Sequence, residues 1–403
     1  MEESLSDIKV LDLTHYIVGP YCTKLLADYG ADVIKIEKPG RGDQVRRMGP
    51  FPGDVPEPEK SGLFHYLNTN KRSITLNLKT NMGRKIFSDM VKDVDILVEN
   101  FEPRVMPGLG LGYPILEGLN PELVMTSISN FGQTGPYRDY KASEIVLFGM
   151  GSEMYGTGHP DRKPVMIAPY SNLFLAGSAA AAGTMAGFYG SRYQDTGQHI
   201  DMAIVEALST GTTRRGVNLL AYQYTGGEIT PRLPAIGAGY PHGAFPCKDG
   251  FLELFGGLAY WDRIVKMMGE PDWLTDPKWK EPTAQADPLL KEEFEANYLV
   301  WLMQRTKEQA AEEAQKAGVP AVPLYEMEEV TRDPHLNERG AFVEIDHPVA
   351  GKWKHIGRPF NMSKTPWQLK RPAPTLGQHN SEVYTGLGFS EEDQVRLRQQ
   401  DVI

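Results

Sequence analysis

Short apolar runs alternate with amphipathic segments along the first 130 residues of this chain. The apolar runs suit buried strands, and segments with a period near 3.6 residues suit helices that cover them. This alternation predicts a parallel sheet, whose ligands bind at the carboxyl ends of the strands. The predicted strands are 9–13, 32–36, 72–78, 95–98 and 123–128, and the predicted helices include 21–29 and 81–91.

The pattern changes in the second half of the chain. Residues 200–220 are predicted to be largely helical, and 222–250 are rich in Gly and Pro, which is typical of a linker or an active-site loop. A strand at 251–256 and helices at 261–268, 289–303 and 307–317 predict a smaller domain. Strand-like pieces at 342–345 and 352–356 precede a short terminal helix. We expect an N-terminal part of a large domain at 1–220, a linker and small domain at 221–325, and a C-terminal part at 326–403.

The stretch 169–190 is predicted to be a helix with an unusual number of Ala and Gly residues. So many small side chains predict close approach by other backbone segments. A membrane span is disfavoured, because Ala and Gly contribute little transfer free energy and no Lys/Arg asymmetry flanks the run. The start of a helix favours an anion, so an acyl-transfer enzyme could place a carboxylate nucleophile there. This chain has Leu173 and Phe174 in that first turn.

Composition excludes several classes of protein. The formal net charge of −10 argues against nucleic acid as the main partner. Two cysteines, Cys22 and Cys247, fit a reducing compartment, and the acidic N-terminal segment lacks the features of a secretory signal. We therefore expect a cytoplasmic globular α/β protein without a metal. The first βα turn reads THYIVGPYC instead of the glycine fingerprint GxGxxG, which counts against a nicotinamide cofactor.

Several motifs, taken in order, resemble one family. They are VLDLTHYIVGP, LLADYGADVIKIEKPGRGD, NTNKRSITLNLKT, ILVENFEP, SISNFGQTGP, GQHIDMAIVEA and RPAPTLGQHN. The chain resembles the class III CoA-transferases of the formyl-CoA transferase and carnitine CoA-transferase type, which include acyl-CoA racemases. The resemblance implies a Rossmann-like large domain built from both chain ends, a smaller α/β domain in the middle and an interlocked dimer. It also implies that CoA or acyl-CoA is a substrate and that no cofactor is bound permanently.

The resemblance also implies which residues contact CoA at the carboxyl ends of the strands. CoA carries a 3′-phosphate and a pyrophosphate, which require Lys or Arg donors. The alternative is that Lys38, Arg41, Arg46 and Arg47 are only a solvated basic run. The expected CoA-binding residues are Ile17, Val18, Lys38, Leu76, Lys79, Asn100, Phe101 and Arg104.

Two departures from the family pattern matter. Gly108 stands where the family commonly has an arginine, and Arg104 is a partial substitute for it. Leu173 stands where the resemblance places the catalytic aspartate, whose carboxylate attacks the thioester. The racemase pair of acid/base groups is also lost, because Ser143 and Leu173 occupy those positions. Glu144 remains as a carboxylate, with an ordinary structural role as the alternative, and we assign no catalytic residue to this chain.

Three hypotheses follow. The first is a CoA-transferase subunit that lacks a nucleophile and pairs with a homologue that retains the aspartate. This arrangement resembles the two-subunit succinyl-CoA:benzylsuccinate branch of the family, which belongs to aromatic catabolism and moves CoA from succinyl-CoA to an aromatic acid. The second is a stand-alone acyl-CoA-binding protein. The third is a thioesterase or isomerase that uses Glu144.

Overall fold

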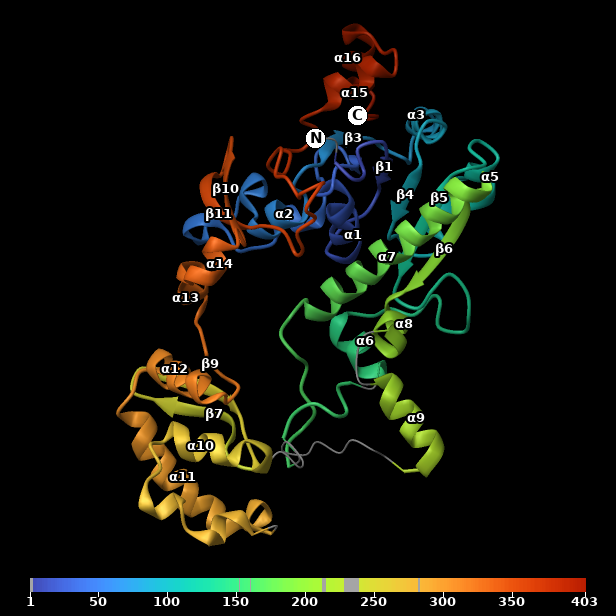
Figure 1. The fold of residues 1–403 in the computed structure, drawn as a ribbon. Helices are drawn as coiled ribbons and strands as arrows, with labels where there is room; N and C mark the ends of the chain where they lie inside the picture. Colours follow the sequence, from blue (N-terminus) through green and yellow to red (C-terminus); the bar gives the residue numbers. More distant parts are fainter. Residues whose placement is uncertain (1–2, 152, 160, 212–214, 228–238, 282) are drawn as a thin grey trace. The chain divides into compact units, whose positions relative to one another are not determined.

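The computed structural model of this protein describes residues 3–403 except 152, 160, 212–214, 228–238 and 282. The chain divides into two compact units (Figure 1). The larger unit comprises Met1–Arg232 and Gly340–Ile403, and the smaller unit comprises Leu233–Arg339. The predicted boundaries at 220 and 325 both fall before these divisions.

Six parallel strands form the sheet of the larger unit, in the order β3-β2-β1-β4-β5-β6 (Figure 1). The predicted parallel α/β class is therefore confirmed, and each of the five predicted strands is present. Because all six strands run the same way, their carboxyl ends meet at one edge of the sheet. The strands are β1 (Lys9–Asp12), β2 (Asp32–Glu37), β3 (Arg72–Thr75), β4 (Ile96–Glu99), β5 (Val124–Ser129) and β6 (Gln198–Ala203).

The prediction of helix from residue 200 onward is wrong at its start, because β6 pairs with β5 and ends the sheet. This edge strand has one apolar and one polar face. Ile200 packs toward the small-residue helix, while His199 lies on the opposite face. An amphipathic segment this short fits both the two-residue period of a strand and the 3.6-residue period of a helix. Only its pairing with β5 decides between the two. The shorter helices α8 (Ile204–Glu206) and α9 (Arg215–Thr225) follow it.

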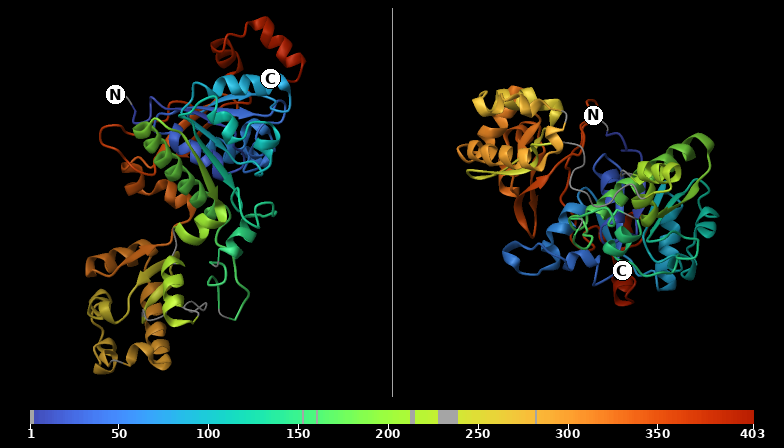
Figure 2. Two further views of the ribbon diagram at one scale, coloured as in Figure 1. Left: turned by 90° about the vertical axis from the view of Figure 1, so that its right-hand side faces the viewer. Right: turned by 90° about the horizontal axis from the view of Figure 1, so that it is seen from below.

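Helices cover both faces of the sheet (Figure 2). Each face has its own apolar core. One face packs against α1 (Val18–Ala27) and α7 (Ser171–Gln194). The other packs against α3 (Asn81–Val91), α5 (Tyr113–Glu117) and the C-terminal helices. The remaining helices of the N-terminal part are α2 (Gly62–Leu67), α4 (Val105–Gly108) and α6 (Glu144–Met150).

The small residues of α7 allow close approach, as the sequence predicts. A Cβ atom added to Gly177 would lie 2.8 Å from the carbonyl oxygen of Val18 in α1. A Cβ atom on Gly187 would lie 2.5 Å from a methyl carbon of Ile200 in β6. Larger side chains at these two positions would push α7 away from the sheet and α1. Within the described part of the chain, no helix is long and apolar enough to span a membrane.

The C-terminal part of the chain returns to the larger unit, as expected. The Tyr384 hydroxyl donates to the carbonyl oxygen of Thr75 at 2.6 Å, and the Thr75 N–H donates to the Asn380 side chain at 2.8 Å. These bonds join α15 (Asn380–Gly386) to the end of β3, beside α16 (Glu391–Gln399) in Figure 1. An antiparallel hairpin of β10 (Phe342–His347) and β11 (Gly351–Ile356) precedes them and confirms both predicted strand-like pieces.

The smaller unit is a three-stranded antiparallel sheet covered by helices. Its strands are β7 (His242–Cys247), β8 (Gly250–Phe255) and β9 (Ala321–Pro323). β7 lies inside the stretch that the sequence predicts to be a linker. Pro246 argues against a strand there, but β7 is an edge strand, and an edge strand tolerates a residue without an N–H group. The helices are α10 (Trp261–Met267), α11 (Pro288–Met303), α12 (Lys307–Ala317), α13 (Met327–Arg332) and α14 (Pro334–Glu338).

Candidate functional site

Two adjoining cavities open at the carboxyl edge of the sheet in the larger unit. The basic cavity has a volume of about 390 Å³ and lies beyond β1, β2 and β3. The central cavity has a volume of about 640 Å³ and extends from the β4 and β5 loops to the start of α7. His15, Gln44 and Phe101 line both cavities. A ligand that is longer than either cavity can therefore pass from one to the other along these three residues.

The basic cavity takes its name from four exposed cations that line it: Lys38, Arg41, Arg47 and Lys79. Leu76 provides an apolar floor beside them. Arg46 does not belong to this group, because its guanidinium is buried and pairs with Glu37 at 2.7 Å. The idea that the whole run 38–47 is a solvated basic segment is therefore wrong for Arg46. Four exposed cations around an apolar floor suit an anionic ligand with an apolar body.

A buried ionic network supports the loops around these cavities. Lys35 pairs with Asp43 at 3.0 Å, and Asp43 also accepts hydrogen bonds from the N–H groups of Tyr16 and Val45. Asp12, at the end of β1, pairs with Lys71, which directly precedes β3, at 3.0 Å. Burial raises the pKa of Asp12, but Lys35 and Lys71 more than offset this effect and hold it well below its usual value. The network ties the loop after β1 to the loop after β2.

The turn after β4 forms the wall between the two cavities. The Asn100 side chain accepts from the His15 N–H at 2.9 Å and donates to the His15 carbonyl oxygen at 2.6 Å. The rings of His15 and Phe101 meet edge to face with centroids 5.0 Å apart. Burial lowers the pKa of His15 and favours its neutral ring. The Asn100 side chain in the turn after β4 therefore holds the backbone of the loop after β1 at His15.

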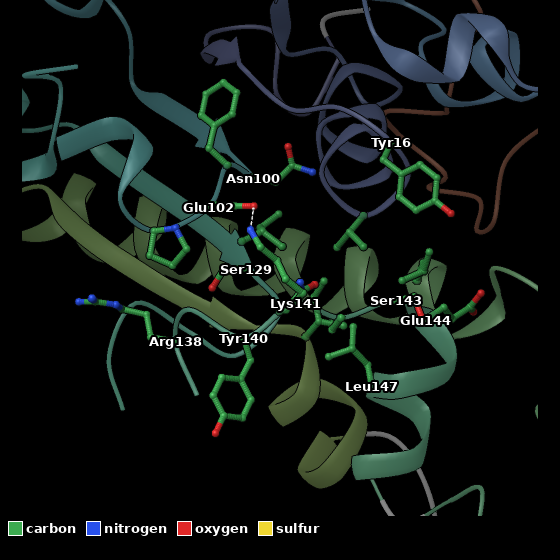
Figure 3. Close-up of a pocket in the computed structure, with 18 of the residues that line it drawn as sticks. Tyr16, Asn100, Glu102, Ser129, Arg138, Tyr140, Lys141, Ser143, Glu144 and Leu147 are labelled. Carbon is green, nitrogen blue, oxygen red and sulfur yellow. Dashed lines mark hydrogen bonds and ion pairs between the residues drawn. The ribbon is translucent and has the colours of Figure 1, made fainter. Parts of the chain in front are cut away.

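The central cavity has an apolar wall and a polar rim (Figure 3). Its apolar wall includes Ile128, Leu147, Leu173 and Ile204. The rim carries the ion pair between Lys141 and Glu102, which joins the loops after β5 and β4 (Figure 3). Its polar lining residues beyond those already predicted include Tyr16, Ser129, Asn130, Tyr140, Lys141 and Ser143.

The start of α7 carries no carboxylate of its own. Leu173 is only 3% exposed and contributes its side chain to both the core and the cavity wall. The anion at this helix start comes from Glu144 in α6, whose carboxylate accepts from the N–H groups of Tyr170 at 2.8 Å and Asn172 at 3.3 Å. The helix dipole favours this arrangement. Glu144 also lines the central cavity, so a carboxylate is present there although Leu173 supplies none.

The predicted CoA-binding residues are divided between the two cavities. Phe101 contacts both, and Ile17 contacts neither, because its side chain is fully buried in the core. Arg104 lines the central cavity, but its side chain is 73% exposed and pairs with Asp139. Lys38, Leu76 and Lys79 line the basic cavity, while Val18, Asn100 and Arg104 line the central one.

Sequence reasoning missed Ser129, Tyr140 and Lys141 as cavity residues. Ser129 is the last residue of β5, and its buried hydroxyl has no hydrogen-bond partner among the described residues. The rule that strand ends meet at one edge was a sufficient signal for Ser129. Tyr140 and Lys141 lie beyond the turn SNFGQTGP, and their approach to the cavity depends on the path of that long loop.

Gly108 leaves room for the arginine that the resemblance places at this position. A Cβ atom added there would have no heavy atom within 4 Å, and its neighbours Val105 and Leu109 line the basic cavity. We expect Gly108→Arg to lower the Kd for CoA about threefold to tenfold through one charge-assisted phosphate contact. Isothermal titration with CoA measures the change. Gly108→Gln is the control without charge, and equal affinities of the two variants would contradict the phosphate contact.

Comparison with known proteins places this geometry in a family. The CoA-transferase family III matches residues 5–380. A formyl-CoA:oxalate CoA-transferase of Bradyrhizobium diazoefficiens is 34% identical, with 97% of this chain and 95% of that protein aligned. A succinyl-CoA–D-citramalate CoA-transferase of Chloroflexus aurantiacus is 33% identical, with 99% and 98% aligned. The crystal structure of a CAIB/BAIF family protein from Brucella suis superposes with a TM-score of 0.81 at 27% identity, covering 96% of this chain and 100% of that one.

This chain belongs to the class III CoA-transferases. Its fold is that of a family named for the transfer of CoA between CoA thioesters and acids.

Proposed function

We propose that this chain is a subunit of a class III CoA-transferase that acts together with a homologue bearing the catalytic aspartate. The observation that carries the proposal is Leu173, a buried apolar side chain at the start of α7 that lines the central cavity. The family mechanism needs a carboxylate there to attack the thioester carbonyl carbon, form an acyl anhydride and release CoA thiolate. A leucine has no lone pair for this attack. The covalent step therefore requires a second chain.

The CoA-binding part of the site supports a role in the complex. The basic cavity keeps Lys38 and Lys79 beside an apolar floor, and Asn100 holds the wall between the cavities. We propose that the CoA phosphates bind Lys38 and Lys79 and that pantetheine passes Phe101 into the central cavity. A chain that lacks the nucleophile but has a cavity suited to CoA is better explained as a subunit than as a protein without function.

For the reaction, we propose transfer of CoA from succinyl-CoA to an aromatic acid such as benzylsuccinate. A relative named for succinyl-CoA as its CoA donor supports the donor, since it is 33% identical over nearly the whole chain. The acceptor is supported by the central cavity, where Tyr16, Phe101 and Tyr140 surround an apolar wall. Aromatic side chains contribute favourable edge and face contacts to an aromatic ligand. Leu173 adds apolar surface where a nucleophile would be.

We propose an interlocked heterodimer as the assembly. The chain exposes large apolar side chains on its larger unit, among them Ile145, Val146 and Met150 on α6 and Tyr189 and Tyr193 on α7. Large apolar side chains that are exposed in groups, such as these two, are found at protein–protein interfaces. Threaded chains would separate only after partial unfolding, so the subunits should not exchange over hours.

A second candidate function is catalysis by Glu144 alone, as a thioesterase or isomerase. The observation that favours it is a carboxylate in the central cavity, held by the N–H groups of Tyr170 and Asn172. The two N–H bonds occupy lone pairs of the carboxylate that attack on a substrate would need. We therefore rank this candidate second.

Co-expression with an aspartate-bearing homologue tests the proposed assembly. Each chain carries a different tag, the product is purified on one tag, and native mass spectrometry measures its composition. We expect a 1:1 heteromer as the main product, with self-pairing as a minor one. A stable homodimer that excludes the homologue would contradict the proposal and favour a stand-alone acyl-CoA-binding protein.

Restoring the carboxylate with Leu173→Asp should give weak transfer at best. The dipole of α7 favours an anion at this position, but Glu144 already accepts the first free N–H groups. The new carboxylate must share the helix start with a like charge, which raises its pKa. A CoA-transfer assay on the purified variant measures this, and Leu173→Asn is the isosteric control. Activity of the variant close to that of an intact transferase would show that the site had lost nothing except its nucleophile.

A further inference from the structure

A polar chain of three side chains crosses the outer half of the sheet on the face opposite α7. Glu99 ends β4, Ser127 lies beside it in β5, and His199 lies in the edge strand β6. The sheet alternates its side chains, so these three residues point to the same face as Leu97 and Met125. None of them lines either cavity, and the proposed function uses none of them.

The chain leads from a buried carboxyl group to an exposed imidazole. Glu99 is 3% exposed and Ser127 is 1% exposed, whereas His199 is exposed. The Ser127 hydroxyl lies 2.8 Å from His199 Nε2. Ser127 is also the residue opposite Glu99 in the neighbouring strand, and its side chain lowers the pKa of the Glu99 carboxyl group. Tyr113 of α5 stacks on the His199 ring with centroids 5.2 Å apart and planes at 14°. This stacking fixes the ring so that one nitrogen faces Ser127.

Glu99 also holds the wall between the two cavities. Its carboxylate accepts the Phe101 N–H at 2.8 Å, which closes the turn 99–101. The next residue inside the turn, Asn100, makes both hydrogen bonds to the His15 backbone. An ionised carboxylate accepts a backbone N–H more strongly than a neutral carboxyl group does. The charge on Glu99 therefore sets how firmly this wall is held.

The surroundings of Glu99 place its titration near neutral pH. Burial raises the pKa of Glu99 to about 7, against the lowering effect of its bonds with Ser127 and the Phe101 N–H. No charged side chain within the described ranges contributes to this shift. Burial also lowers the pKa of His199, while Asp201, two residues along β6, raises it. Ser127 and His199 can thus pass protons between solvent and a carboxyl group that water does not reach.

We propose that Glu99 is a positioning residue for CoA, and that Ser127 and His199 connect it to solvent for proton exchange. Ionised Glu99 orders the turn that carries Asn100 and Phe101, and protonated Glu99 loosens it. The affinity for CoA should therefore rise with pH across neutrality. The proposal rests on the proposed binding of CoA along this turn, but not on any partner subunit or on transfer activity.

Titration calorimetry with free CoA at several pH values from about 6 to 8 tests the linkage. Between these limits we expect the Kd of the unaltered chain to fall about threefold to tenfold, the difference between a charged and a neutral hydrogen bond. Glu99→Gln keeps the shape of the side chain and removes its charge, so its pH dependence should be much smaller. The CoA phosphate titrates in this range with both proteins, so its contribution cancels in the comparison. Equal pH dependence of the two proteins would overturn the proposal.

A second measurement needs no ligand and separates this proposal from the proposed function. The chain is labelled with ¹⁵N-Phe and ¹³C-carboxyl Glu, and the Phe101 and Glu99 signals are assigned by their loss in Phe101→Leu and Glu99→Gln. We expect both signals to titrate together with a midpoint near 7, and Ser127→Ala to shift this midpoint. A Phe101 signal that ignores pH would refute the positioning role. A chain that shows the coupled titration but never forms an active transferase would refute the proposed function alone.

Discussion

Incubated alone with an acyl-CoA and a carboxylic acid, this chain is expected to transfer no CoA. The expected rate is at least on the order of 10⁴-fold below that of an aspartate-bearing homologue, because loss of a catalytic nucleophile typically costs this much. The physical reason is Leu173, whose buried side chain occupies the start of α7. Chromatographic separation of the acyl-CoA products measures the rate.

Hydroxylamine trapping strengthens this experiment. An acyl-enzyme anhydride or a CoA thioester on a carboxylate reacts with hydroxylamine and leaves a hydroxamate that mass spectrometry detects. We expect no modified residue in this chain and a modified aspartate in the homologue treated in parallel. A hydroxamate on Glu144 that disappears in Glu144→Gln would contradict the subunit proposal and establish the second candidate function.

Lys71→Met is expected to lower the free energy of unfolding by about 3–5 kcal/mol. Lys71 is fully buried and donates to Asp12 at 3.0 Å, to the Pro20 carbonyl oxygen and to the Asn68 side chain. Methionine fills a similar volume but leaves the Asp12 charge buried beside fewer partners. Removal of one member of a buried ion pair costs far more than the pair contributes, because the remaining charge stays desolvated. Urea unfolding followed by circular dichroism measures the loss.

The matched control for this prediction is Lys92→Met. Lys92 pairs with Asp89 three residues earlier, and both side chains are 50% exposed. Such a pair contributes less than about 0.5 kcal/mol, so the same substitution there should leave the unfolding midpoint nearly unchanged. Similar losses at the two positions would mean that the Asp12–Lys71 pair is not the source of the effect.

The fold was largely predictable from the sequence because its determinants are local. Apolar runs and amphipathic segments identified β1 to β5, and the Ala and Gly residues of 169–190 predicted the close packing that Gly177 and Gly187 show. β6 and β7 escaped prediction for a different reason. β6 has too few residues to distinguish the period of a strand from that of a helix. β7 contains a proline, which is permitted there because β7 lies at the edge of its sheet.

The candidate site was predictable only in part. Lys38 and Lys79 follow strand ends, and strand ends of a parallel sheet meet at one edge. The role of Glu144 at the start of α7 was not predictable, because 26 residues of loop and helix separate it from Tyr170. Arg46 likewise reads as one more cation of a basic run, and only burial against Glu37 separates it from its neighbours. Contacts between distant loops depend on packing that no local pattern specifies.

The most direct test of the central claim is the transfer rate of the purified complex. Succinyl-CoA and benzylsuccinate are supplied to four samples: this chain, the aspartate-bearing homologue, their co-purified complex, and a complex in which the homologue's aspartate is replaced by alanine. We expect transfer by the intact complex, none by this chain and none by the alanine complex. Transfer by the alanine complex, or by this chain alone, would contradict the proposal.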